Sequence, residues 1–278
     1  MKNVNRVLFV LLVLGLVAPT LCAQEAADRV VVPLSDPGKP GIVKAHLING
    51  AITVTGYGGK EVIVEARPRG KVVPAEEKSS SKHPGMKRLR VSGGGLQVEE
   101  RQNLVEIEVP AWKADVDLVI QVPVATSLQL HSVNNGGIQV ENISGEIEVE
   151  NVNGSITLTR ISGSVVAQTV NGNVTAAFLR LEGQKPLSLV TLNGDVDLTL
   201  PASTKADLKM RIDNNGEIYS DFELQLQEKT DRSVRDEREK GGRFRVTIDR
   251  SVQGSINGGG REITLKTFNG DILLRKAK

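Results

Sequence analysis

A nine-residue repeat that carries a glycine in each copy constrains this chain more than any other feature. Five consecutive copies, over residues 135–179, read NGGIQVENI, SGEIEVENV, NGSITLTRI, SGSVVAQTV and NGNVTAAFL. Their glycines stand nine residues apart, at Gly136, Gly145, Gly154, Gly163 and Gly172. A fixed period indicates that the chain repeats one small structural unit, so the repeat has to be explained before any fold is assigned.

Apolar residues stand at fixed distances from each glycine. After Gly145 they are Ile147, Val149 and Val152. The first two alternate with polar residues, as in a strand with one buried face. The third is out of phase by one residue, and a straight strand would point it to the opposite side. A bend between the second and third positions would return it to the interior, which predicts a chain that turns a corner in every unit.

The predicted fold class is all-β, as a β-solenoid of short stacked parallel strands with Asn-Gly and Ser-Gly corners. Two units would form one coil of about 18 residues. Because Asn-Gly also favours tight hairpins, an antiparallel β meander or sandwich is the alternative.

Glycines are expected at the corners because corners need left-handed backbone angles. The signature also occurs outside the strict array, and the 22-residue steps from Gly172 to Gly194 and on to Gly216 indicate coils with short insertions. The predicted turn glycines are Gly50, Gly136, Gly145, Gly154, Gly163, Gly172, Gly194, Gly216 and Gly270.

Residues 1–23 have the features of a secretory signal peptide. Lys2 and Arg6 flank the start of an apolar stretch, residues 7–17, that is too short to span a bilayer. Cys22, the only cysteine, follows a leucine where a lipoprotein signal needs a small residue, so a lipid anchor at Cys22 is disfavoured. These features predict export to the periplasm or cell surface, with no transmembrane span after cleavage.

Residues 24–278 are predicted to form one domain, because the repeat signature recurs from near the start of this region to its end. Alternating apolar residues predict further strands at 105–109 and 116–122. The segments 68–95 and 227–242 hold many charged and few apolar residues, so they are predicted to be flexible loops.

The run that begins at residue 118, LVIQVPVATSLQLHSVNNGGIQVENISGEIEVENVNGSITL, is followed further on by TLNGDVDLTLPAS. Both resemble the bacterial putative-adhesin domain family of unknown function, whose members repeat nG-x-[IV]-x-[VL] and often place NGDV-x-L-x-LP after the array. The resemblance covers about residues 40–274, and the repeat is similar in style to autotransporter adhesin head domains. It implies a secreted β-solenoid on the cell envelope and carries over no catalytic residue.

The charge balance argues against nucleic-acid binding. The whole chain has 35 Lys and Arg against 33 Asp and Glu, and the predicted signal peptide holds two of the cations and none of the acids. The mature chain is therefore neutral, and it lacks the positive field that holds nucleic acid.

No residue pattern predicts a metal, a cofactor or a catalytic site. Calcium-binding nonapeptide β-helices need G-G-x-G-x-D, and the units of this chain lack that pattern. His46, His83 and His131 stand alone in their segments, without a second ligand at a metal-binding interval. Acidic pairs such as Asp195 and Asp197 alternate with apolar residues, which indicates a solvated strand face rather than paired catalytic carboxylates. The chain is therefore predicted not to be an enzyme.

Two features are predicted surface contacts. Trp112 follows a proline at a strand edge, where its ring would be open to a sugar. Lys82, Lys87, Arg88 and Arg90 lie in the first loop and would attract anionic envelope polymers or lipid headgroups. The alternative for the basic residues is an ordinary solvated loop.

Together these observations predict a secreted, non-enzymatic cell-envelope protein that acts by surface contact, as an adhesin-like module or a scaffold. Its partner would be an envelope or extracellular polymer or protein. Asparagine and threonine side chains on the strands and turns suit binding spread over a face rather than in a deep pocket. Two alternatives stand beside this function: a carbohydrate-acting β-helix enzyme and a self-assembling structural solenoid.

Overall fold

The computed structural model describes residues 28–69, 96–109, 115–181, 185–227, 231–236, 244–249 and 251–277. These residues form strands and turns, and none of them belongs to a helix that could cross a membrane. The predicted signal peptide with Cys22 lies outside the described residues, and so do the predicted contact residues Trp112, Lys82, Lys87, Arg88 and Arg90.

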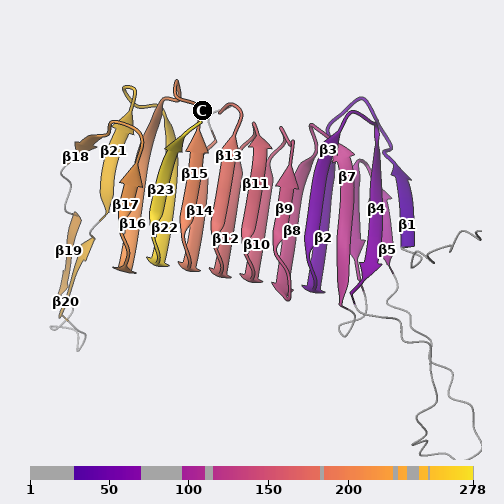
Figure 1. The fold of residues 1–278 in the computed structure, drawn as a ribbon, viewed down its shortest axis with the longest axis horizontal. Helices are drawn as coiled ribbons and strands as arrows, with labels where there is room; N and C mark the ends of the chain where they lie inside the picture. The colour runs from indigo at the N-terminus through magenta and orange to yellow at the C-terminus, as the bar shows by residue number, and fades with distance from the viewer. Residues whose placement is uncertain are drawn as a thin grey trace, which may run out of the picture.

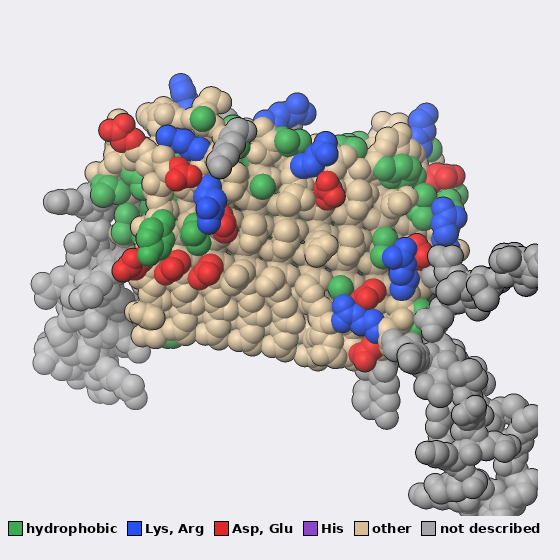
Figure 2. Space-filling model, viewed as in Figure 1, with side chains coloured by type: hydrophobic (Ala, Val, Ile, Leu, Met, Phe, Trp, Pro, Cys, Tyr) green, Lys and Arg blue, Asp and Glu red, His purple; other side chains and the backbone are tan. Residues whose placement is uncertain are grey.

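Two large sheets face each other, and sheet A is turned to the viewer in Figures 1 and 2. Its ten strands are, in spatial order, β1 (Asp28–Pro33), β4 (Glu61–Pro68), β7 (Val116–Pro123), β3 (Ile52–Tyr57), β9 (Ile138–Glu141), β11 (Ile156–Ile161), β13 (Val174–Phe178), β15 (Val196–Leu200), β23 (Ile272–Lys276) and β17 (Ile218–Ser220).

Sheet B lies behind sheet A. Its eleven strands are, in spatial order, β18 (Gln225–Gln227), β21 (Val252–Ile256), β16 (Ala206–Asn215), β22 (Arg261–Asn269), β14 (Leu187–Asn193), β12 (Val165–Asn171), β10 (Ile147–Asn153), β8 (Ser127–Asn134), β2 (Ile42–Asn49), β6 (Leu104–Glu108) and β5 (Gln97–Arg101). The predicted strands at 105–109 and 116–122 correspond to β6 and β7.

The repeat array forms coils that alternate between the sheets. The chain runs along β10 in sheet B, turns into β11 in sheet A, and returns to sheet B as β12. Strands of successive coils pair in parallel, with Ile147 opposite Val165 and Ile156 opposite Val174. Each of these coils therefore contains 18 residues, or two units, as predicted. The fold is all-β and solenoid-like, and the parallel pairing contradicts the alternative antiparallel meander.

The order of the coils in space differs from their order in the chain. The coil of β2 and β3 lies between the coil of β6 and β7 and that of β8 and β9. At the other end, the coil of β22 and β23 is inserted between β14–β15 and β16–β17. The 22-residue step from Gly194 to Gly216 is therefore not one coil, because the coil that carries Gly270 separates these two glycines.

Antiparallel strands close the ends of the stack. β4 and β1 cover one end of sheet A, and β5 covers the same end of sheet B. At the opposite end, β21 and β18 cover sheet B. A parallel coil left open would offer other chains a row of unpaired N–H and C=O groups, and short antiparallel strands limit that edge.

One predicted loop contains regular structure. The sequence predicts a loop over 227–242, yet residues 231–236 form β19, which pairs antiparallel with β20 at 244–249. The backbone accounts for the difference, because a two-stranded ladder is built from N–H and C=O groups that every such residue carries. Most of the other predicted loop, at 70–95, lies outside the described residues.

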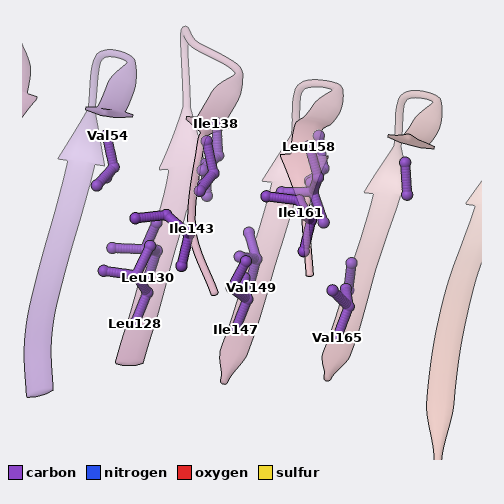
Figure 3. Close-up of a cluster of buried hydrophobic side chains, with 14 of the residues drawn as sticks. Val54, Leu128, Leu130, Ile138, Ile143, Ile147, Val149, Leu158, Ile161 and Val165 are labelled. Carbon is purple, nitrogen blue, oxygen red and sulfur yellow. The ribbon is translucent and has the colours of Figure 1, made fainter. Parts of the chain in front are cut away.

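Apolar side chains from both sheets fill the space between them (Figure 3). Ile147 and Val149 of β10, and Ile156 and Leu158 of β11, are at most 2% exposed. Figure 3 shows Ile147, Val149 and Leu158 in this interior. The two-residue alternation of each strand places these side chains inside and the residues between them outside. Complete burial of one such side chain contributes roughly 1.5–3 kcal/mol. The described buried residues form one continuous core.

The bend predicted in every unit does not occur in every unit. Ile161 is fully buried, because Arg160 has a left-handed φ of 57° and the strand register shifts between Leu158 and Ile161. On β12 the strand stays straight, so Val170 points outward and Thr169 takes the buried position. The prediction is right for Ile161 and wrong for Val170 and Val152, since Val152 also lies on the outer side of its strand while Asn151 is buried. The result is a pair of apolar residues on the outside of sheet B.

Candidate interaction surfaces

Asparagines at the ends of the sheet B strands form a ladder along one edge of the molecule. At each step the Nδ2 of one asparagine donates a hydrogen bond to the Oδ1 of its neighbour, over 2.7–3.0 Å. The members in order are Asn134, Asn153, Asn171, Asn193, Asn269 and Asn214. The ladder therefore ties together coils that are far apart in the chain, such as those of Asn193 and Asn269.

The corner glycines pack against the backbone of the neighbouring coil. A Cβ on Gly154 would lie 2.1 Å from the carbonyl oxygen of Gly136, and a Cβ on Gly163 would lie 1.9 Å from that of Gly145. The sequence attributes these glycines to left-handed backbone angles. A positive φ, between 130° and 153°, does occur at Gly50, Gly172, Gly194, Gly216 and Gly270, but not at Gly154 or Gly163. At those two corners the close approach of two backbones is what excludes a side chain.

Polar side chains on either side of the glycine complete the Asn-Gly corners. The Oγ1 of Thr169, which points inward, donates a hydrogen bond of 2.9 Å to the carbonyl oxygen of Gly154. The Oδ1 of Asp195 accepts a hydrogen bond of 2.8 Å from the backbone N–H of Asp271. Equivalent bonds recur along the stack. Asp195, which the sequence assigns to a solvated face, is therefore also a structural acceptor between coils.

The outer face of sheet A, called the A face below, is flat and rich in threonine. Outward residues of neighbouring strands lie in register, as in the row of Thr53, Gln139, Thr157 and Thr175. The threonines of the face are Thr53, Thr55, Thr157, Thr159, Thr175 and Thr199. Figure 2 shows a broad middle surface in which charged and hydrophobic side chains are sparse.

The outer face of sheet B, called the B face below, has an open hollow of about 490 Å³ between β6 and β10. His46 and His131 lie side by side in it, with ring centroids 4.9 Å apart. The Nδ1 of His131 is 3.4 Å from the Oε2 of Glu150, and the Nζ of Lys44 is 3.7 Å from the Oε1 of Glu106. The described part of the chain contains no group of three or more His, Cys, Asp or Glu side chains that could hold a metal ion.

A second hollow of about 480 Å³ lies on the same face between β8 and β22. Apolar side chains line much of it, and Val170, Leu192 and Phe268 are 38%, 44% and 39% exposed. At its far end the Nζ of Lys266 is 3.1 Å from the Oδ2 of Asp213. The B face thus combines exposed apolar residues with charged side chains, in contrast to the middle of the A face.

Asp213 also pairs with Arg211. Burial raises the pKa of Asp213, but the hydrogen bonds with Arg211 and Lys266 outweigh burial and hold the pKa below its usual value. A lowered pKa in the folded state means that the carboxylate stabilises the fold at neutral pH. This contribution is lost as the pH falls below the pKa of an aspartate in the unfolded chain, about 4, and then through the lower pKa of Asp213 in the folded state.

We expect Asp213→Asn to lower the free energy of unfolding by about 1 kcal/mol at pH 7. The loss should be smaller at pH 3, because this pH lies below the pKa of an aspartate in the unfolded chain, where the carboxylate contributes less to stability. Urea unfolding at both pH values measures the difference. Glu262→Gln, an exposed substitution on the adjacent strand β22, should leave stability unchanged. An equal loss for Asp213→Asn at both pH values would contradict the assigned role.

One family model matches well over half of the chain. The model of the Toastrack DUF4097 family matches residues 86–257. The chain belongs to the Toastrack family. This membership agrees with the predicted resemblance at the level of a family of unknown function. No curated protein matches this Toastrack sequence.

Two solved structures show a distant likeness to the Toastrack chain. One is a putative cell adhesion protein from Clostridium sporogenes, 10% identical, with a TM-score of 0.43 over 91% of this chain and 100% of that one. The other is a putative adhesin from Bacteroides fragilis, 6% identical, with a TM-score of 0.27 over 91% of this chain and 98% of that one. At these scores the likeness carries no argument about function.

The Toastrack fold places all nine predicted turn glycines in connections between strands. It also brings together two residues that the sequence treats as isolated, because His46 pairs in register with His131. A signal for this contact exists in the sequence. Each histidine stands three residues before a ladder-position asparagine, Asn49 or Asn134, which are themselves in register.

Proposed function

We propose that this Toastrack chain is an exported, non-enzymatic protein of the cell envelope that acts by surface contact, as an adhesin-like module or a scaffold. The observation that carries the proposal is the A face, with its threonine rows in register on a flat sheet. Export rests on the predicted signal peptide at residues 1–23, which would deliver the chain to the periplasm or cell surface. The turn glycines and the asparagine ladder have a structural role in this proposal.

The A face suits a polymer that repeats hydroxyl groups, such as an envelope glycan. Strands lie about 4.8 Å apart and outward residues repeat about every 7 Å along a strand, so the hydroxyls form a regular grid. Each threonine hydroxyl both donates and accepts hydrogen bonds. Its β-branched side chain has few rotamers, so little conformational entropy is lost on binding. Many weak contacts in register would hold an extended polymer without a deep pocket.

The test compares binding of the mature chain to insoluble envelope polysaccharide before and after removal of two hydroxyls. Thr157→Val with Thr159→Val keeps the shape of the side chains, and loss of two hydrogen bonds should weaken retention about 10-fold. Thr264→Val, the same substitution on the opposite sheet, should leave retention unchanged. Unchanged retention of the double variant would exclude the A face as the contact. Release of soluble sugar by the wild-type chain would instead support the enzyme alternative.

A further inference from the structure

The Asn-Gly corners differ in whether the backbone N–H of the glycine is hydrogen-bonded. At most of them this N–H donates a bond of 2.8–2.9 Å to the carbonyl oxygen of an asparagine in the neighbouring coil. The donors are Gly50, Gly154, Gly172, Gly194 and Gly270. Among the described residues, the N–H groups of three further Asn-Gly glycines find no such acceptor. These are Gly136, Gly216 and Gly258.

Two of these three corners carry an asparagine that the ladder leaves out. Asn135 and Asn215 each directly follow a ladder member, Asn134 or Asn214. Both are exposed, and neither side chain hydrogen-bonds to another residue in the described part of the chain. Asn215 also lies in the coil of β16 and β17, and β17 is the last strand of sheet A. No further parallel coil is therefore paired beyond it to offer the following glycine an acceptor.

A ladder corner holds the same groups on both sides. The Nδ2 of Asn171 donates a hydrogen bond of 2.9 Å to the Oδ1 of Asn153. Its own Oδ1 accepts a bond of 2.9 Å from the Nδ2 of Asn193, and the N–H of Gly172 donates to the carbonyl oxygen of Asn193. The side-chain amide and the following backbone nitrogen are thus fixed in bonds to different coils.

The third unbonded glycine follows a side chain that is held. The Nδ2 of Asn257 donates to the carbonyl oxygens of Ala202 and Thr204, over 3.1 and 2.7 Å. Only at Asn135 and Asn215 are the side-chain amide and the next backbone N–H both without a partner among the described residues.

We propose that Asn135 and Asn215 are sites of spontaneous deamidation, and that the ladder protects the other corners. The backbone nitrogen of the glycine gives its proton to water and bonds to the Cγ of the asparagine. The bond from Cγ to Nδ2 breaks, and Nδ2 takes a proton from water and leaves as ammonia. A five-membered succinimide ring remains. Glycine favours this closure because it has no Cβ to hinder its nitrogen.

Water then opens the ring. It adds to one of the two ring carbonyl carbons, and the bond from that carbon to the ring nitrogen breaks, with the proton passing to the nitrogen. The product is aspartate or isoaspartate, depending on which carbonyl is attacked. The balance is one water consumed and one ammonia released, and no oxidant or reductant takes part.

The ladder slows this reaction because a closed corner must first open. At least two hydrogen bonds have to break there, one at the glycine N–H and one at the side chain. Two bonds of ordinary strength lower the population of the open corner about 30-fold. We therefore expect Asn135 and Asn215 to deamidate about 30-fold faster than Asn171 and Asn193 in the folded chain.

The product at Asn215 changes how the end coil is attached. In isoaspartate the chain runs through Cγ, and the carbonyl that accepts the N–H of Gly270 becomes a free carboxylate. Two residues further on, the N–H of Glu217 donates a bond of 2.8 Å to the Oδ1 of Asp271. Both bonds join the coil of β16 and β17 to that of β22 and β23. The modification should therefore loosen β17 from β23.

The experiment incubates the mature chain, residues 24–278, in mildly alkaline buffer below its unfolding midpoint. Peptide mapping by mass spectrometry then gives the deamidation rate at each asparagine. Isoaspartate should accumulate with aspartate at Asn135 and Asn215, because only the ring yields both products. The same chain in denaturant is the control. There the ladder is absent, so Asn171 and Asn193 should react as fast as Asn135 and Asn215.

Asn171→Ala tests the protection itself. It removes the side-chain partner of both Asn153 and Asn193, so the rates at these two sites should rise several-fold. The rate at Asn215 should not change, which separates loss of the ladder bonds from general destabilisation. Hydrogen exchange of β17 should become faster in aged wild-type chain and should stay constant in aged Asn215→Gln, which lacks the reactive asparagine.

Equal rates at Asn171 and Asn215 in the folded chain would overturn the proposal. So would an unreactive Asn135 and Asn215 in the folded chain while the denatured chain reacts. Aspartate without isoaspartate would exclude the ring. Unchanged rates at Asn153 and Asn193 in Asn171→Ala would show that the ladder gives no protection.

Discussion

Gly163→Ala is expected to lower the free energy of unfolding by about 3 kcal/mol, near the upper end of what overpacking costs. The added Cβ would lie 1.9 Å from the carbonyl oxygen of Gly145 and 2.8 Å from that of Ser144. Backbone atoms cannot rotate away as a flexible side chain can, so the two coils have to separate locally. Their separation would strain the hydrogen bonds between coils at this edge. Urea unfolding of the mature chain, followed by circular dichroism, measures the loss.

Gly58→Ala is the matched control for this prediction. Nothing lies within 4 Å of a Cβ at Gly58, and neither Gly58 nor Gly163 has a positive φ. The two substitutions therefore differ in the space around the glycine and not in the left-handed region of the backbone. Gly58→Ala should be neutral or stabilising by about 0.4–1 kcal/mol, through the entropy of the unfolded chain. Similar stabilities for the two variants would refute the close-approach explanation of the corner glycines.

Ile161→Ala is expected to lower the free energy of unfolding by about 3 kcal/mol, because it removes a fully buried side chain and leaves a cavity. The strand bend at Arg160 is what turns this residue into the core. The equivalent position of the next unit is Val170, which remains on the outside. Thermal and urea unfolding of Ile161→Ala and Val170→Ala would therefore compare the same repeat position pointing inward and pointing outward.

Val170→Ala should change the stability of the monomer by no more than about 0.5 kcal/mol, as is usual for surface positions. Equal losses for Ile161→Ala and Val170→Ala would show that the bend occurs in both units. That result would contradict the outward orientation of Val170.

The candidate surfaces were only partly predictable from the residues. Threonine and asparagine on strands and turns indicate contact over a face, and the alternation of Thr157 with Leu158 predicts which side is outside. The set of side chains that share the B face was not predictable, because it depends on which strands are neighbours. Glu150 and Lys266 are 116 residues apart in the chain, yet only β12 and β14 separate their strands.

The sequence by itself determined the all-β class, the 18-residue coil of two units and the places where the chain leaves its strands. These follow from local physics, because alternation sets the buried face and glycine marks the positions where a side chain does not fit. Only the tertiary structure decided that β2–β3 and β22–β23 are inserted between other coils, that His46 meets His131, and that Val170 stays outside. Every coil offers its neighbours the same rows of N–H and C=O groups, so the repeat does not encode which coil lies next to which. That choice depends on packing over the whole stack.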